Sequence, residues 1–171
     1  TTTTHKTLRG PRGAMIFARK DIILGKKSLY QFINSAVFPG LQGGPHNQQT
    51  MAIAVCLKEA SSAKFRTYAK KIIVNAKTLA EELTKLGFAI ISQGTDNHLM
   101  LVDLRPFKVN GEDASQWLYQ AGIVVNKNAI PNDPLPPTKA SGIRLGTPAV
   151  TTRNMGAREM RQFAKWIDSV I

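Results

Sequence analysis

Residues 1–13 read Thr-Thr-Thr-Thr-His-Lys-Thr-Leu-Arg-Gly-Pro-Arg-Gly, and the rest of the chain is organised around this stretch. The four threonines favour an extended backbone, because two heavy substituents on Cβ suit a pleated strand. The closing Gly-Pro-Arg-Gly predicts a turn, and the apolar run Ala14–Ala18 behind it predicts a buried strand. We therefore expect Lys6 between a strand end and a turn that leads back into a core.

Lys6 has three potentially cationic neighbours, His5, Arg9 and Arg12. A lysine that is crowded by cations and shielded from water loses part of its preference for the protonated form, and its amine can then attack a carbonyl. Arginine side chains bind phosphate or carboxylate bidentately. A carbonyl compound that also carries a phosphate would use both features, and pyridoxal phosphate is such a compound. The alternative interpretation is an ordinary lysine on an exposed loop.

The composition is that of a folded protein with an excess of basic residues. Hydrophobic residues make up 43% of the 171 residues, and 23 Lys and Arg against 11 Asp and Glu give a net charge of +12. The charge raises the possibility of nucleic-acid binding. However, the basic residues are spread along expected helices and are not interleaved with aromatics on a strand, so we expect no nucleic-acid partner. No apolar run reaches the length of about 18 residues that a membrane span needs.

Two further features bear on the origin of the chain. It begins without a methionine, inside an expected strand, so we expect the natural polypeptide to extend upstream. The single cysteine, Cys56, lies in an apolar stretch, which predicts a buried thiol in a reducing compartment.

A second candidate site is the segment 39–45, Pro-Gly-Leu-Gln-Gly-Gly-Pro, which cannot form regular structure. Its glycines permit positive φ and let backbone N–H groups approach an anion closely. A helix is expected directly after it, from His46 to about Ser61, and a helix N-terminus favours an anionic ligand. The pattern predicts a phosphate-binding loop, with a plain loop as the alternative.

Residues Ala63–Leu86 carry apolar side chains at spacings of three and four and predict a long amphipathic helix that ends at Gly87. Helices of this length often join two domains, so we predict domains at 1–61 and 62–171. The remaining expected elements are strands at Phe88–Ser92, Leu99–Leu104 and Ile123–Val125, helices at Glu112–Ala121 and Ala157 to about Val170, and a rigid proline-rich loop at Ile130–Lys139.

Arg144 is the last candidate, within the apolar and glycine-flanked segment Ser141–Pro148. Ile143 and Leu145 share one face of an expected strand, and Arg144 points to the other. An arginine packed within apolar sequence needs an anionic partner, because an unpaired buried charge is costly. That partner is either a protein carboxylate or a substrate carboxylate. We expect no metal site, since His98 has no second ligand at metal-binding spacing.

Five separate stretches resemble serine hydroxymethyltransferases, in that family's order and over nearly the whole chain. They are Thr3–Lys6 with Leu8–Gly13, Asn34–Gly40 with Gln42–Pro45, Thr95–His98, Val125–Asn128 with Pro131–Asp133, and Ser141–Arg144 with Gly146–Pro148. The resemblance implies an α/β protein of the aspartate-aminotransferase-like fold (fold type I), comprising the tail of the large domain and a small α+β domain. It also implies interconversion of serine and glycine, with tetrahydrofolate accepting the one-carbon unit, in a cytoplasmic homodimer with shared active sites.

The resemblance assigns the cofactor residues first. Lys6 would bind pyridoxal 5′-phosphate covalently. His5, Thr3 and Thr4 would line the cofactor and influence proton transfer and reaction specificity. Arg12 would act as a positioning group near the active site.

It also assigns the phosphate and substrate contacts. Gly43 and Gly44 would offer backbone N–H groups to the cofactor phosphate of the partner subunit. Arg144 would clamp the carboxylate of the amino acid. Asn128 and the loop Pro136-Pro137-Thr138 would contact the folate, although this loop departs from the more usual small-polar, proline, aromatic sequence of the family.

Several groups that the family needs lie before its lysine: the aspartate paired with the pyridine nitrogen, a stacking histidine, the catalytic tyrosines and a glutamate. We therefore expect these 171 residues to be inactive alone. Two alternatives stay open. One is a basic nucleic-acid-binding or interaction domain, and the other is a folate-independent pyridoxal-phosphate aldolase that acts on β-hydroxy amino acids.

Overall fold

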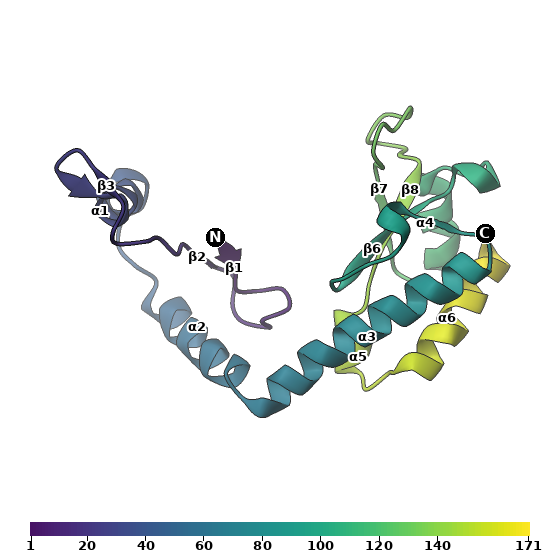
Figure 1. Ribbon diagram of the computed structural model, residues 1–171, viewed down its shortest axis with the longest axis horizontal. Helices are drawn as coiled ribbons and strands as arrows, with labels where there is room; N and C mark the ends of the chain where they lie inside the picture. Colours follow the sequence, from purple (N-terminus) through teal and green to yellow (C-terminus); the bar gives the residue numbers. More distant parts are fainter. The chain divides into compact units, whose positions relative to one another are not determined.

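The computed structural model describes all 171 residues, which form two compact units, Thr1–Arg66 and Thr67–Ile171 (Figure 1). Helix α3, Ala63–Lys85, contains the point where the units divide. It is the long helix predicted from the apolar spacing, and Gly87 follows it with a φ of 93°. This positive φ is the backbone conformation that a glycine after a helix end adopts readily.

The first unit consists of short elements. They are β1 (Thr2–Thr3), β2 (Ala14–Met15), β3 (Ile23–Leu24), β4 (Lys27–Ser28), α1 (Leu29–Ser35), a π-helical turn (Ala36–Leu41) and α2 (Asn47–Ala60). Strand β1 pairs antiparallel with β2, and β3 with β4. Helix α2 confirms the helix expected from His46 to about Ser61. The extended threonine run is confirmed only at Thr2–Thr3.

The expected buried strand Ala14–Ala18 is wrong in length and in burial. Only its first two residues pair with β1, and the next two, Ile16 and Phe17, are 50% and 74% exposed. Because β2 has one short neighbour in its sheet, no second strand or layer of this unit covers the rest of the apolar run.

The second unit holds a four-stranded antiparallel sheet in the order β5-β6-β8-β7. Its elements are β5 (Ala89–Ile90), β6 (Leu99–Asp103), α4 (Gly111–Gln120), β7 (Asn126–Asn128), β8 (Gly142–Gly146), α5 (Pro148–Thr152) and α6 (Ala157–Val170). Short 3₁₀ turns lie at Ile91–Gln93 and Arg105–Phe107. The helices α4 and α6 agree with prediction, as does strand β6.

One hydrophobic core joins a single face of this sheet to α3, α4 and α6 (Figure 1). The strands contribute Val102 and Ile143, which face each other across β6 and β8 and are almost fully buried. The helices contribute Leu83, Leu118 and Met160, each with no exposed surface. Burying a side chain of this size stabilises the fold by about 1.5–3 kcal/mol. The sheet therefore has a core face and an opposite face.

Two predicted strands are corrected. The segment Ile123–Val125 is a connection, because the N–H of Ile123 bonds to the carbonyl of Leu118 at 2.8 Å as part of the turn that ends α4. The strand begins only at Asn126. Strand β5 ends at Ile90 because Ser92 adopts a φ of 63°, which takes the chain out of extended conformation.

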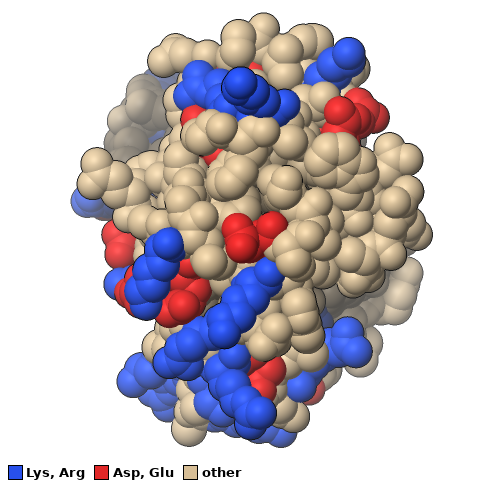
Figure 2. Space-filling model, turned by 90° about the vertical axis from the view of Figure 1, so that its right-hand side faces the viewer, with Lys and Arg blue, Asp and Glu red and all other residues tan.

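The charged surface mixes both signs. In Figure 2, Lys and Arg side chains gather toward the lower edge of the view, with fewer Asp and Glu side chains between them. Glu82 of α3 has basic neighbours: its hydrogen bond with Lys85 lowers the pKa of this carboxyl, and Arg161 and Lys165 of α6 act in the same direction. None of the helices has the length and apolar character needed to cross a membrane.

Candidate functional site

The loop that carries Lys6 is closed by backbone hydrogen bonds around Thr4, whose side chain is fully buried. The N–H of Thr4 donates to the carbonyl of Gly13 at 3.0 Å, and its carbonyl accepts the N–H of Gly10 at 2.8 Å. Its Oγ1 donates to the carbonyl of Pro11 at 2.6 Å. The chain reverses direction between Thr4 and Gly13, but its turn lies at Thr7–Leu8, and the predicted turn at Gly10–Gly13 contains only a bend at Arg12.

Helix α2 supports this loop through Gln49, Ile53 and Cys56, which share one helix face because they are spaced four and three residues apart. Gln49 Nε2 donates to the carbonyl of Arg12 at 3.2 Å. Cys56 Sγ donates to the carbonyl of Leu8 at 3.2 Å. The predicted burial of Cys56 is confirmed, but this support was missed from sequence. The signal was present in the periodicity of α2.

Two glycines allow the loop to lie close to α2. A Cβ on Gly10 would come within 2.6 Å of Cys56 Sγ and 2.8 Å of the carbonyl oxygen of Thr4. A Cβ on Gly13 would come within 3.1 Å of Ile53 Cδ1. The loop backbone therefore packs more tightly on the helix than a residue with a side chain would permit at Gly10.

Lys6 itself is exposed, which contradicts the expected shielding by this chain. The loop contacts α2 through its carbonyl groups and glycines, and the Lys6 side chain takes part in none of these contacts. The neighbouring His5 is half-buried, and its Nδ1 atom is buried without a hydrogen-bond partner. Thr3 is half-buried in β1. Thr3, Thr4, His5 and Lys6 are consecutive in the sequence and therefore lie on one segment.

The two arginines of the predicted cationic cluster differ in their surroundings. The guanidinium carbon of Arg9 lies 5.7 Å from the centre of the Phe65 ring, a cation–π contact. The side chain of Arg12 is exposed, and only its backbone carbonyl is held, by α2.

Gly43 and Gly44 are exposed and contribute to an open hollow of about 730 Å³ directly before α2. No atom lies within 4 Å of a Cβ built on either residue. Helix α2 has no side-chain cap at its N-terminus, where His46 is the cap residue. The hollow extends to His46, the residue directly before α2, and the N-terminus of a helix favours an anion.

In the second unit, the register of β7 and β8 places two predicted substrate residues on one sheet face. Arg144 lies opposite Asn126 on one side and Leu101 on the other. Asn128 lies opposite Gly142, two residues along the same strands, and so shares the face of Arg144. This is the face opposite the core.

Arg144 is exposed on that face and forms no ion pair with a protein carboxylate. The predicted alternation is confirmed, since its neighbours Ile143 and Leu145 are buried. The inference that Arg144 is buried among apolar residues is wrong, because the open sheet face is not covered by a second layer of this unit. Of the two partners considered for Arg144, the protein carboxylate is therefore not found in the structure.

The proline-rich segment is an irregular loop, as predicted. Its residues Pro136, Pro137 and Thr138 are exposed. Their positions are set from both sides: Lys127 Nζ donates to the carbonyl of Thr138 at 2.5 Å, and the N–H of Lys139 donates to the carbonyl of Pro136 at 2.9 Å. The loop thus presents an ordered backbone next to β7.

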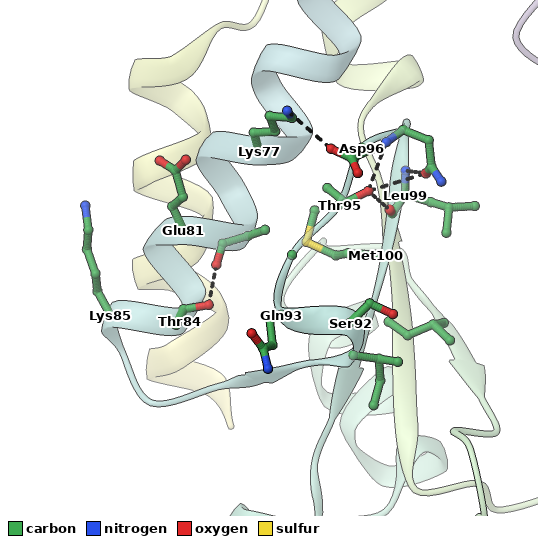
Figure 3. Close-up of a pocket in the computed structure, with 15 residues that line it drawn as sticks. Lys77, Glu81, Thr84, Lys85, Ser92, Gln93, Thr95, Asp96, Leu99 and Met100 are labelled. Atoms are coloured by element: carbon green, nitrogen blue, oxygen red, sulfur yellow. Dashed lines mark hydrogen bonds and ion pairs between the residues drawn. The ribbon is translucent and has the colours of Figure 1, made fainter.

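A hollow of the second unit with a volume of about 830 Å³ lies between α3 and the segment Ile91–Leu101 (Figure 3). Lys77 and Asp96 face each other across it at 3.4 Å. None of the residues predicted to bind cofactor or substrate lines it. His98 lies outside this lining, is exposed, and contributes its carbonyl to a hydrogen bond from the N–H of Thr147 at 3.0 Å. The structure contains no group of three His, Cys, Asp or Glu side chains that could hold a metal ion.

Comparison with known proteins gives one consistent result. The model of the serine hydroxymethyltransferase family matches residues 1–167. The serine hydroxymethyltransferases of Phenylobacterium zucineum and Acidothermus cellulolyticus are both 56% identical to the chain, over 171 and 169 residues, which is 100% and 99% of the chain. That of Sorangium cellulosum is 55% identical over 170 residues. The chain spans 38% of the length of each of these relatives.

Proposed function

Because this chain belongs to the serine hydroxymethyltransferase family, we propose that it is the C-terminal part of an enzyme that interconverts serine and glycine with pyridoxal phosphate and tetrahydrofolate. The family match over residues 1–167 is the observation that carries the proposal. Residues 1–61 would be the tail of the large domain of a fold type I transferase, and 62–171 its small C-terminal domain. The mixed α/β character of both units agrees with this assignment.

The Lys6 loop has the properties that a covalent cofactor site needs. The amine of Lys6 is accessible, while the backbone around it is fixed by α2. His5 Nδ1 is buried and unpartnered, and a buried polar atom of this kind needs a hydrogen-bond partner that this chain does not supply. When bound, pyridoxal phosphate supplies an electron sink for a carbanion at Cα of the amino acid. In this proposal Lys6 holds the cofactor, and His5, Thr3 and Thr4 line it and influence where protons move.

The glycine loop has the properties of a phosphate site. The hollow at Gly43 and Gly44 borders the uncapped N-terminus of α2, whose N–H groups carry partial positive charge. We assign to these two glycines the cofactor phosphate of a partner subunit, as the family resemblance implies. A homodimer is then part of the chemistry, and we place the enzyme in the cytoplasm.

The open sheet face has the properties of a substrate site. Arg144 presents a planar guanidinium that is not paired with a protein carboxylate, and a substrate carboxylate can bind it bidentately. Asn128 shares this face, and Pro136-Pro137-Thr138 follows it in the β7–β8 loop. In this proposal Arg144 orients the amino acid, while Asn128 and the loop contact the folate.

The full-length protein provides the test of substrate and acceptor. Purified enzyme saturated with pyridoxal phosphate is incubated with serine, and glycine is measured with and without tetrahydrofolate. The proposal predicts glycine formation that depends on tetrahydrofolate. Glycine formation that is indifferent to tetrahydrofolate would favour a folate-independent aldolase instead. The isolated 171 residues are expected to be inactive, since the family's other catalytic groups precede its lysine.

A further inference from the structure

The carboxylate of Asp133 accepts four hydrogen bonds from three residues of the β7–β8 connection. Its Oδ1 accepts the N–H of Leu135 at 2.9 Å and the hydroxyl of Ser141 at 2.6 Å. Its Oδ2 accepts the N–H of Ile130 at 3.1 Å and the N–H of Ser141 at 2.8 Å. Each oxygen therefore has two donors, and all four are within ordinary hydrogen-bonding distance.

These bonds require Asp133 in its ionised form, because only the carboxylate accepts on both oxygens without a proton of its own. Burial alone raises the pKa of this group. The hydrogen bonds from Ser141, Leu135 and Ile130 outweigh that effect and hold the pKa well below its usual range. The group therefore stays charged in neutral solution, and charge-assisted hydrogen bonds are stronger than neutral ones.

Two of the three donor residues, Ile130 and Ser141, lie at the two ends of the loop. Ile130 follows β7 by two residues and is 5% exposed. Ser141 precedes β8 by one residue, and its carbonyl also accepts the N–H of Leu104 at 3.0 Å. The connection between β7 and β8 extends beyond the sheet in Figure 1. Asp133 links its beginning, at Ile130, to its end, at Ser141 directly before β8.

Two proposed ligand contacts depend on the parts that Asp133 joins. Arg144 stands three residues after Ser141, on the strand that begins directly after Ser141. Pro136-Pro137-Thr138 lies within the loop that the carboxylate closes. A substitution at Asp133 would therefore displace both Arg144 and this loop, without removing any group that is proposed to contact a ligand.

We propose that Asp133 is a positioning residue that sets the Ile130–Ser141 connection and Arg144 in one fixed arrangement, and so couples binding of the amino acid to binding of the folate. It acts through the loop and does not touch the reacting atoms. The inference rests on the proposed function, since it is that function which gives Arg144 and the loop their ligands.

The substitution Asp133→Asn tests the arrangement with little change in size. An amide replaces one acceptor oxygen by an NH₂ group, which would face at least one backbone N–H in either orientation of the side chain. Ser141→Ala removes a single hydroxyl donor and leaves the three backbone donors in place. Asp168→Asn, at an exposed position of α6, makes the same charge change as a matched control.

The experiment uses the full-length enzyme, saturated with pyridoxal phosphate and shown first to convert serine with tetrahydrofolate. For Asp133→Asn we expect the KM for serine and the KM for tetrahydrofolate each to rise by about tenfold or more, with kcat changed less. The cofactor absorption spectrum should be unchanged. The amides of Ile130, Leu135 and Ser141 should exchange hydrogen faster in the variant. Asp168→Asn should match the parent enzyme in every measurement.

The outcomes separate this inference from the proposed function. A parent enzyme that does not convert serine contradicts the function, whereas the amide exchange still reports on the loop. Unchanged KM values in a folded Asp133→Asn enzyme overturn the positioning role, as do raised KM values with fully protected amides. If Asp133→Asn does not fold, Ser141→Ala decides: smaller rises in both KM values with faster exchange at Leu135 support the role, and parent-like values overturn it.

Discussion

The thiol of Cys56 on α2 donates a hydrogen bond to the carbonyl oxygen of Leu8, two residues after Lys6, at 3.2 Å. Gln49, two turns earlier on the same helix face, holds the carbonyl of Arg12. Together they fix the backbone at two points after Lys6, while the amine of Lys6 is left exposed. A reactive amine on a fixed backbone is what orientation of a covalently held cofactor requires.

Gly10→Ala tests the close packing of this loop on α2. The added Cβ would meet Cys56 Sγ at 2.6 Å and the carbonyl oxygen of Thr4 at 2.8 Å, and the second atom is backbone that cannot rotate away. We expect the full-length protein to lose about 1–3 kcal/mol of stability in thermal unfolding. Gly43→Ala is the control, because open space surrounds its Cβ position. Equal unfolding temperatures for the two variants would contradict the packing described for the loop.

Gly142→Ala tests the close approach of β8 to its neighbours in the second unit. Its Cβ would lie 2.6 Å from both Ile130 Cγ2 and the carbonyl oxygen of Val102. Overpacking of this kind typically costs about 1–3 kcal/mol. In Gly156→Ala the nearest atom to the new Cβ is 3.7 Å away, so this matched variant should unfold near the parent temperature. If the Gly142→Ala protein were as stable as Gly156→Ala, β8 would be able to shift away from these atoms without loss of stability, which would contradict the prediction.

Acid should destabilise the second unit through Asp103. The residue is 7% exposed, and the hydrogen bonds of its carboxyl with Arg105 lower the pKa of that carboxyl despite the opposing effect of burial. Below the ordinary aspartate pKa of about 3.9, the unfolded chain binds a proton that the folded chain still excludes. The free energy of unfolding should therefore fall as pH drops below about 4, and Asp133 should add to the same trend.

Urea unfolding at several pH values between neutrality and strong acid measures this effect. Asp103→Asn should lower stability at neutral pH and reduce the loss that acid causes, because one of the groups with a lowered pKa is gone. A stability that is constant or rises as pH falls below about 4 would contradict the role of these two carboxylates.

Arg144→Lys keeps the positive charge but removes the planar fork. If Arg144 binds a carboxylate bidentately, the KM for serine should rise by about tenfold to a hundredfold, since a lysine presents a point charge instead. The matched control is Arg153→Lys, an exposed arginine in the turn after α5. A KM for serine that is the same in both variants would remove Arg144 from the substrate site.

Much of the second unit could be predicted from sequence, because periodicity reports directly on burial. The helices α3, α4 and α6 follow from apolar spacings of three and four, and the face of Ile143 and Leu145 follows from alternation. The strand predicted at Ile123–Val125 failed because a short apolar run has the same pattern in a strand and in a connection. Here the turn that ends α4 decides, and Asn126–Asn128 pair instead.

The candidate site was predicted by residue type more accurately than by environment. Both Lys6 and Arg144 were expected to be buried, and both are exposed in the structure. Apolar neighbours in sequence do not imply a covering layer in space, as Ile16 and Phe17 also show. The four bonds to Asp133 could not be predicted either, because they depend on how a loop without periodicity returns to its starting strand.

Borohydride trapping on the full-length protein tests the central claim most directly. The folded protein is incubated with excess pyridoxal phosphate, reduced with borohydride, digested and mapped by mass spectrometry. The account predicts a pyridoxyl group on Lys6, and its loss in Lys6→Arg with the fold retained. A folded protein that shows no adduct at Lys6, or that carries the adduct on another lysine, would contradict the account.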